Sequence, residues 1–291
     1  MKVGLQINRF DFPGGDKKIG ANVKKISVAA EEAGFDSIWV MDHFFQLPGI
    51  GNYTDPMLEA YTTLGYIAGV TEKVKLGTMV TGVIYREPAL LINAVTALDV
   101  LSGGRAYFGI GAGWNDQEAK ALGLLDPLHS NRFDRLEDTL KLALQMWAGD
   151  AKPFKGKMYE LPEPHLSPQP VSQPHPPILI GGGGEEKTLR FVALYGDACN
   201  LFAHDMDQLV HKLEVLKKHC QDVKRDYASI EKSVLAGTDI NSAANDPGPV
   251  LARAKKLKDL GIDHLMYSNS KDADLNSYKK FAVTVKKMHE L

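Results

Sequence analysis

One pattern repeats along the chain: a short run rich in apolar and β-branched residues is followed by a stretch with helical periodicity. We count eight such units in 291 residues. Strands that alternate with helices need crossover connections, so they predict a parallel sheet. Eight units predict an α/β fold of the closed (β/α)8 TIM barrel type. An open doubly wound sheet would carry a dinucleotide-binding glycine fingerprint after its first strand, where Asn8-Arg9-Phe10-Asp11 stands instead.

The alternation gives approximate positions for the elements. Strands are expected over residues 3–8, 37–43, 74–80, 105–110, 178–180, 198–202, 234–240 and 264–268. Helices are expected over residues 17–34, from 56, over 88–101, up to 147 with the clearest part at 132–147, and from 185, 207, 247 and 272.

Residues 150–177 interrupt this rhythm because eight of the 28 positions are proline, which excludes a helix. We interpret the segment as an insertion after the fourth strand-helix unit, with a short hairpin around Lys155-Gly156-Lys157. The segment is too short to be a second domain. The sequence therefore predicts a single barrel domain over residues 1–291.

Composition excludes several classes of protein. With 34 basic and 36 acidic side chains the net charge is only -2, which argues against a nucleic-acid binder driven by its overall field. The first residues alternate apolar and polar side chains, and no stretch approaches the length of a membrane span, so we expect no secretion signal and no membrane association. Cys199 and Cys220 are too few for a disulfide framework and indicate a reducing, cytoplasmic location.

In a (β/α)8 barrel the reactive groups lie where the strands end, and Asp42-His43 follows the second predicted strand. An imidazole at that place can donate or accept a proton near neutral pH. The alternative is a histidine whose hydrogen bonds are satisfied by neighbouring backbone. The segment from His204 to Asp207 is more typical of a helix cap than of a ligand cluster, so no metal site is predicted.

Four consecutive glycines, Gly181 to Gly184, precede Glu185 and the next expected helix. Bare glycine amides at a helix start are suited to hold a phosphate group. The alternative is a tight turn, which needs one or two glycines rather than four. The Gly-Lys-Thr spacing of a nucleotide-hydrolysing loop is missing, which disfavours that activity.

A second glycine-rich strand end runs from Gly109 to Trp114. Its glycines either let a ligand approach the backbone or allow close packing of strand and helix. Together with the other two features, it suggests a large phosphorylated cofactor across the barrel mouth. No serine or cysteine nucleophile stands beside a base, and no carboxylate pair ends two strands, which favours redox chemistry.

Five segments, in order, resemble the bacterial luciferase-like superfamily and, more narrowly, its coenzyme F420-dependent oxidoreductases. They are Ser37-Ile-Trp-Val-Met-Asp-His43, Leu76-Gly-Thr-Met-Val80, Arg86-Glu-Pro-Ala89, Gly104-Arg-Ala-Tyr-Phe-Gly-Ile-Gly-Ala-Gly-Trp-Asn115 and Gly181-Gly-Gly-Gly-Glu-Glu-Lys-Thr-Leu-Arg190. The resemblance spans nearly the whole chain. It implies a barrel that binds coenzyme F420, or alternatively FMN, at its mouth.

The resemblance also implies roles for single residues. Asp42 and His43 would lie beside the deazaflavin ring, with His43 as the catalytic proton donor or acceptor. Met79-Val80 would be a non-prolyl cis peptide behind the ring. The remaining cofactor contacts would be Gly113 and Gln117 to the ring or its side chain, and Gly182, Gly183, Gly184 and Glu185 to the phosphate through backbone amides.

Two positions depart from the F420-dependent glucose-6-phosphate dehydrogenases of that family. A proton-handling glutamate is replaced by Trp114, and an aromatic residue is replaced by Leu47. These changes argue against a sugar phosphate, and Trp114 would form an apolar wall suited to a less polar substrate.

Three functions therefore remain open. The first is hydride transfer between coenzyme F420 and a small organic substrate. The second is an FMN-dependent monooxygenase that uses oxygen and reduced flavin supplied by a partner reductase. The third is a non-catalytic flavin-binding relative, which would have lost the histidine or the glycine loop, and this chain keeps both. The family often forms homodimers, which we also expect here.

Overall fold

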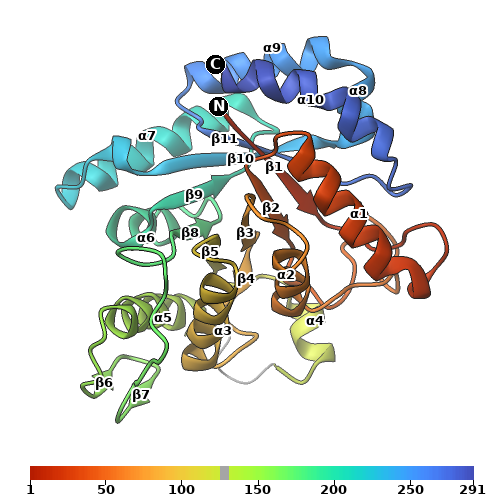
Figure 1. Ribbon diagram of the computed structural model, residues 1–291. Coiled ribbons are helices and arrows are strands. Elements are labelled where there is room, and N and C mark those ends of the chain that lie inside the picture. The colour runs from red at the N-terminus through yellow and green to blue at the C-terminus, as the bar shows by residue number, and fades with distance from the viewer. Residues whose placement is uncertain (125–130) are drawn as a thin grey trace.

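The computed structural model describes residues 1–124 and 131–291, so part of the helical region expected before Arg132 lies outside it. Eight parallel strands pair in a closed ring, which confirms the predicted barrel (Figure 1). In ring order they are β1 (Lys2–Ile7), β2 (Ser37–Val40), β3 (Lys75–Thr78), β5 (Ala106–Gly111), β8 (Ile178–Gly181), β9 (Ala198–Leu201), β10 (Glu231–Asp239) and β11 (His264–Ser268), and β11 pairs with β1. A two-residue strand, β4 (Thr81–Gly82), pairs with the end of β5.

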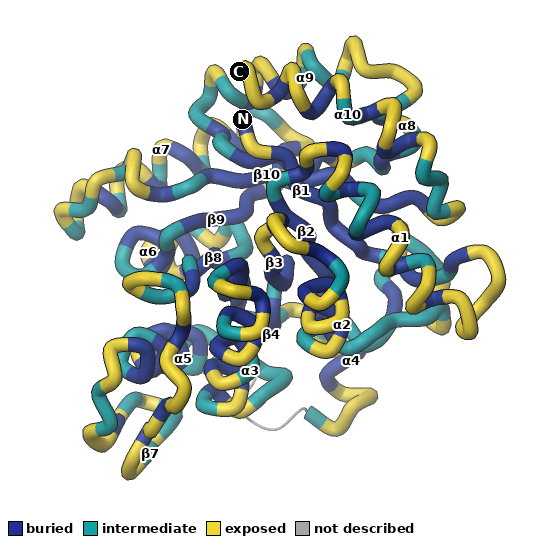
Figure 2. The backbone as a smooth tube through the Cα atoms, viewed as in Figure 1, coloured by how far each residue is buried: buried dark blue, intermediate teal, exposed yellow. Residues whose placement is uncertain are grey.

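Helices surround this ring in Figure 1 and carry their exposed residues on the outside in Figure 2. They are α1 (Ile19–Glu32), α2 (Ala60–Ala68), α3 (Pro88–Leu101), α4 (Asp116–Ala121), α5 (Arg132–Trp147), α6 (Thr188–Tyr195), α7 (Met206–Asp222), α8 (Ile240–Asn245), α9 (Pro247–Asp259) and α10 (Leu275–His289). Within the described residues, none of them is long and apolar enough to cross a membrane.

Several expected boundaries were wrong. The helix expected from residue 56 begins at Ala60, and the helix expected from residue 272 begins at Leu275. The strand expected over residues 37–43 ends at Val40, because the Asp42 and His43 side chains bind other loops where the ladder would continue. The helix expected from Glu185 begins at Thr188, after a turn. The extra helix α8 follows β10 directly, since Asp239 accepts hydrogen bonds from the amides of Asn241 and Ser242 and caps it.

The proline-rich insertion lies after the fourth strand-helix unit, as predicted, and contains the expected hairpin. Strands β6 (Phe154–Lys155) and β7 (Glu160–Leu161) pair in antiparallel fashion. The Asp138 carboxylate on α5 accepts the Met158 amide at 2.7 Å, and Lys157 pairs with Asp134 at 2.8 Å. The hairpin is therefore attached to α5, beside which Figure 1 draws it.

The main core lies between the sheet and its helices, and a smaller cluster fills the barrel interior. Trp39 is the largest side chain of that interior, and its ring packs edge-on to Tyr107 at 5.3 Å. Glycine is needed beside it, because a Cβ atom on Gly77 would stand 2.6 Å from the Trp39 ring.

At the amino-terminal end of the barrel, a buried polar network ties four strands together. The Trp39 indole donates to Ser37 at 2.7 Å, and Ser37 contacts the His264 Nε2 atom at 2.9 Å. The other ring nitrogen of His264 lies 2.9 Å from Glu231, whose second oxygen accepts from Lys2 at 2.6 Å. Burial alone would raise the pKa of Glu231, but His264 and Lys2 lower it to about 2.

We predict that Glu231 makes the stability of the fold depend on acid pH. The pKa of Glu231 falls from its ordinary 4.5 to about 2, so the ionised carboxylate stabilises the fold above about pH 4.5. This contribution, roughly 2–3 kcal/mol, is lost as the pH falls towards 2. Urea denaturation of the wild type and of Glu231→Gln should show a gap in unfolding free energy that is constant above pH 5 and shrinks below it.

Glu214→Gln, on the exposed side of α7, is the control for this measurement and should leave the curve unchanged. A gap between wild type and Glu231→Gln that stays the same from pH 7 to pH 3 would show that the network contributes through packing and not through charge.

Candidate active site

The predicted catalytic histidine lies where β2 ends, and a buried carboxylate holds it. The His43 Nδ1 atom lies 2.7 Å from Glu118 Oε2, and the Glu118 side chain is fully buried. Glu118 belongs to α4, a short helix that starts directly after the glycine-rich end of β5. Asn115 caps this helix by accepting the Glu118 amide at 3.2 Å.

Three further donors reach the same carboxylate. The Tyr85 hydroxyl donates to it at 2.6 Å, and the amides of Phe44 and Phe45 both donate to Oε1, the latter at 2.9 Å. Burial alone would raise the pKa of Glu118, but the hydrogen bonds from His43, Tyr85 and Phe45 lower it below its ordinary value. Glu118 is therefore a carboxylate that accepts from His43, which leaves the His43 Nε2 atom available for a ligand.

Trp114 stands next to His43 at the mouth. The two ring centroids are 5.6 Å apart in an edge-to-face arrangement, and 62% of the Trp114 surface is exposed. A large apolar side chain so exposed beside an imidazole is available to cover a bound ligand. The apolar wall expected from the sequence stays a prediction.

The neighbouring Asp42 faces away from solvent and binds Arg86. The guanidinium donates two hydrogen bonds to the Asp42 carboxylate, at 2.5 and 2.9 Å, and a third to Glu59. Arg86 also lies over the Tyr61 ring, 4.9 Å from its centroid. Burial raises the pKa of Asp42, and Arg86 offsets part of that increase. Asp42 thus anchors the loop that carries His43.

The Met79-Val80 peptide is cis, as the resemblance implies. The Val80 side chain packs against the ends of β5 and β8, where both strands carry a glycine. A Cβ atom on Gly111 would stand 3.0 Å from a Val80 methyl, and one on Gly181 would stand 2.8 Å from the other. At Gly109 a Cβ atom would meet the Thr78 carbonyl oxygen at 1.8 Å. These glycines therefore serve close packing, the alternative that the sequence left open for the fourth strand end.

The glycine loop after β8 has a different character. Only Gly182 of its four glycines adopts a positive φ, at 114°, and its amide donates to the Asn200 carbonyl at 3.2 Å. A Cβ atom on Gly184 would contact the Thr188 hydroxyl at 2.9 Å, whereas one on Gly183 would meet only the Lys212 Cε atom at 3.8 Å. A tight turn accounts for one glycine, and the loop keeps room above Gly183.

Glu185 is attached to α7. Its carboxylate accepts from Lys212 and lies 3.2 Å from the His211 Nε2 atom, and its carbonyl oxygen accepts from His219 at 2.7 Å. The hydrogen bonds from Lys212 and His211 lower the pKa of Glu185. Its side chain is therefore directed towards α7, while its backbone continues the glycine loop.

The remaining predicted contacts lie around α4. Gly113 adopts a positive φ of 78°, and its carbonyl accepts from Arg132 at 3.1 Å. Gln117 is exposed, whereas its neighbour Glu118 is buried. Sequence reasoning missed Glu118, because an acidic residue in the first turn of a helix is also what the helix dipole favours. Arg86 was expected only as part of a motif, and its partners Asp42 and Glu59 were not predicted.

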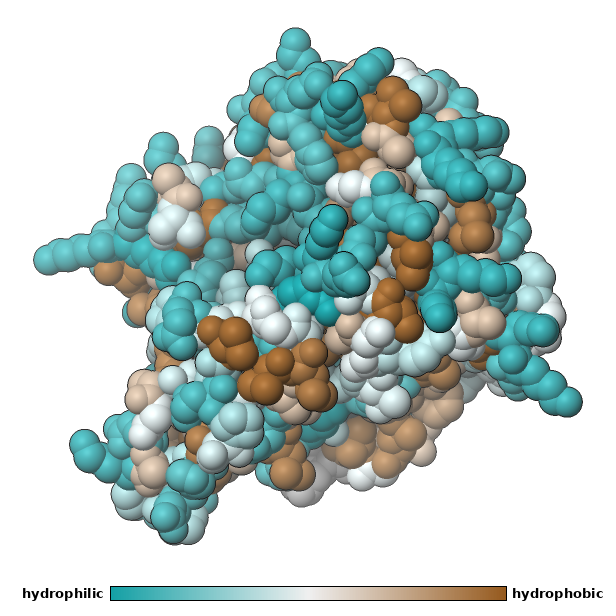
Figure 3. All heavy atoms as spheres, in the orientation of Figure 1, coloured by the Kyte–Doolittle hydropathy of each residue, from teal (hydrophilic) through white to brown (hydrophobic). Residues whose placement is uncertain are grey.

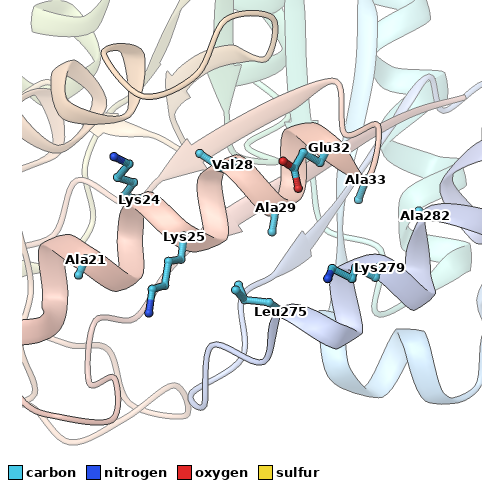
Figure 4. Close-up of a pocket in the computed structure, with 10 residues that line it drawn as sticks. All are labelled: Ala21, Lys24, Lys25, Val28, Ala29, Glu32, Ala33, Leu275, Lys279 and Ala282. Atoms are coloured by element: carbon cyan, nitrogen blue, oxygen red, sulfur yellow. The ribbon is translucent and has the colours of Figure 1, made fainter.

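Two of the hollows on the surface of the described residues are not lined by His43. One of about 550 Å³ lies among the loops that follow β1, β10 and β11, where Arg9, Asp239, Ser270 and Lys271 line it. It belongs to the same end of the barrel as His43, since all these loops follow strands. The larger one, of about 730 Å³, lies between α1 and α10 on the outside (Figure 4), and none of the predicted site residues lines it.

Comparisons with known proteins agree with this architecture. The family model described as luciferase-like monooxygenase matches residues 1–238. The chain is 26% identical, over 92% of both proteins, to an F420-dependent glucose-6-phosphate dehydrogenase of Amycolatopsis mediterranei. It is 30% identical, over 60% of its length, to the pyrimidine monooxygenase RutA of Allorhizobium ampelinum, of which the alignment spans 47%.

A solved structure with the same fold is that of an F420-dependent secondary alcohol dehydrogenase in complex with an F420-acetone adduct. It superposes with a TM-score of 0.81 at 19% identity, covering 99% of this chain and 98% of the other.

Proposed function

Because the chain belongs to the luciferase-like monooxygenase family, we propose that it is a cytoplasmic coenzyme F420-dependent oxidoreductase. In this proposal a hydride passes between the deazaflavin and a small organic substrate. The observation that carries it is the His43–Glu118 pair, a histidine with one nitrogen fixed by a buried carboxylate and the other available at the mouth. The similarity to an F420-dependent dehydrogenase over 92% of both proteins supports the choice of cofactor.

The residues at the mouth fit such a cofactor. Val80 fills the space left by Gly111 and Gly181 and would support the back of the ring. The open backbone at Gly183, just before α6, would hold the phosphate through amide groups and the positive end of that helix. Trp114 would shield the ring from water. When bound, the deazaflavin would supply the site that accepts or donates the hydride.

His43 would handle the proton that accompanies the hydride. When a carbonyl or imine gains a hydride, its oxygen or nitrogen also takes up a proton, and the reverse reaction releases one. His43 Nε2 would give or take that proton, and the Glu118 carboxylate would stabilise the protonated imidazole through Nδ1. Tyr85 and the amides of Phe44 and Phe45 would keep Glu118 in place, so these groups position His43 without touching the substrate.

An FMN-dependent monooxygenase is the second candidate, and the similarity to RutA supports it. FMN and coenzyme F420 share the ribityl and phosphate portion, so the glycine loop would suit both. The two candidates differ in their requirements, because the monooxygenase needs oxygen and reduced flavin from a separate reductase.

We predict that purified apoprotein binds coenzyme F420 more tightly than FMN. Gly183→Asp should abolish F420 binding, because it puts a side chain and a negative charge where the phosphate is expected. Ligand fluorescence during titration gives both dissociation constants. Tighter binding of FMN would favour the oxygen-dependent monooxygenase. If the apoprotein binds neither cofactor, both candidate functions are refuted.

We further predict that His43→Gln lowers the rate of hydride transfer about 100-fold or more, while F420 affinity changes little. Glu118→Gln should give a smaller loss and move the pH profile of kcat/KM to lower pH, because a neutral amide stabilises the protonated imidazole less well. Deazaflavin absorbance would follow the reaction, using the best substrate from a panel of secondary alcohols, ketones and imines.

Lys120→Gln, an exposed change on the same helix, is the matched control and should behave as the wild type. A Glu118→Gln enzyme with reduced rate but an unchanged pH profile would contradict the proton-handling role of the pair.

We also propose that two copies of the chain associate through α2 and α3. The exposed residues of both helices are uncharged, and Leu90 and Leu101 are 68% and 79% exposed. Figure 3 shows apolar side chains gathered over α3. Burying this uncharged, partly apolar surface against a second copy of the chain would stabilise a dimer.

Light scattering should therefore give about twice the chain mass of 31.9 kDa. The double change Leu90→Glu and Leu101→Glu should produce monomers, because it introduces charges that the contact would bury. Val283→Glu, an equally apolar and exposed position on α10, should leave the dimer intact. A monomeric wild type would contradict the proposal.

A further inference from the structure

We propose that Lys212 binds the phosphate group of the cofactor, and that it exchanges its ion pair with Glu185 for the phosphate when the cofactor binds. This inference rests on the proposed function in one respect, because it assumes a cofactor that carries a phosphate ester. It adds a side chain from another helix to a site that the sequence assigned to the glycine loop alone.

The geometry around Gly183 singles out this lysine. A Cβ atom built on Gly183 would have one heavy atom within 4 Å beyond its chain neighbours, the Cε atom of Lys212 at 3.8 Å. Lys212 lies on α7, the helix that follows the neighbouring strand β9. Its side chain is only 20% exposed, and its ammonium group already donates to the Glu185 carboxylate at the edge of the loop. A group bound above Gly183 would therefore lie within reach of that ammonium.

The charges near the loop favour a cation as partner of a phosphate. Glu185 and Glu186 directly follow the four glycines, so two negative charges lie close in sequence to a phosphate held there. Lys187 lies over the Phe133 ring, 5.2 Å from its centroid, and is engaged there. The contacts of Lys212 with Gly183 and Glu185 place its side chain beside the loop. A phosphate is a stronger partner than an exposed carboxylate, because charge-assisted contacts to it add to those from the glycine amides.

The loop can keep its shape during this exchange. The Glu185 carbonyl oxygen accepts from His219 at 2.7 Å, and this contact involves the backbone and not the carboxylate. His211 remains beside the carboxylate at 3.2 Å after Lys212 moves. Glu185 therefore competes with the phosphate for the same ammonium group.

Two pairs of ligands test this proposal: FMN with riboflavin, which differ by the phosphate alone, and coenzyme F420 with its ribityl deazaflavin, which lacks both the phosphate and the tail. Lys212→Gln should weaken binding of the phosphorylated member about tenfold, the loss expected for one charge-assisted contact, and leave the other within about twofold. Glu185→Gln should strengthen binding of the phosphorylated member several-fold, since it removes the competing carboxylate. Dissociation constants come from fluorescence titration, so no turnover is needed.

Lys217→Gln, an exposed lysine on the same helix, is the matched control and should change neither constant. Lys212→Arg should restore most of the lost affinity, and circular dichroism would establish that each variant is folded. The difference between Lys212→Gln and wild type should also shrink as salt rises, because ions screen the contact.

If Lys212→Gln loses equal affinity for both members of a pair, Lys212 only shapes the loop. If it loses no affinity for either member, the phosphate lies elsewhere. A wild type that binds FMN no more tightly than riboflavin, and coenzyme F420 no more tightly than its counterpart, would overturn the inference outright. A preference for FMN over coenzyme F420 would overturn the proposed function instead, and the FMN pair would still decide the role of Lys212.

Discussion

The candidate site depends on one buried charge, the carboxylate of Glu118. Removing such a group from water costs several kcal/mol unless nearly every lone pair is occupied. Here His43, Tyr85 and the amides of Phe44 and Phe45 all donate to it. Because these donors come from the loops after β2 and β4, while Glu118 follows β5, one carboxylate fixes the relative positions of three loops. The direction of the His43 ring is a consequence of that arrangement.

The rest of the mouth combines a second buried carboxylate with glycines. Asp42 is compensated by Arg86, which reaches it from the segment before α3 and also binds Glu59. Bidentate geometry makes this pairing directional, so it fixes the loop that leads from β2 to His43. Val80 in turn requires that Gly111 and Gly181 carry no side chain. Charge pairs thus hold the loops, and missing Cβ atoms determine how closely the strand ends approach one another.

The barrel was predictable because its signal is periodic and repeated. Elements with clear ends, such as α3 with Pro88 at its first turn and β11, match the expected boundaries. The end of β2 was missed because Met41 continues the apolar run while tertiary contacts of Asp42 and His43 end the ladder. The partners of His43 were not predictable either, since Glu118 lies 75 residues away in sequence and only the closed barrel brings it near.

Ion pairs within the chain also determine how this mouth can recognise charge. Arg86 is bound by Asp42, Lys212 by Glu185, and Arg9 by Asp11, to which Lys271 adds a contact at 3.2 Å. These four cations near the strand ends therefore each have an internal carboxylate partner. A charged ligand that binds one of them must replace a carboxylate that already holds it. Selectivity then follows from how easily each pair opens: Arg86 is held by two carboxylates, one of them buried, whereas Lys212 is held by a carboxylate on an exposed turn. The proposed exchange would therefore be easiest beside the glycine loop, where an anion would gain backbone amides in addition to the lysine.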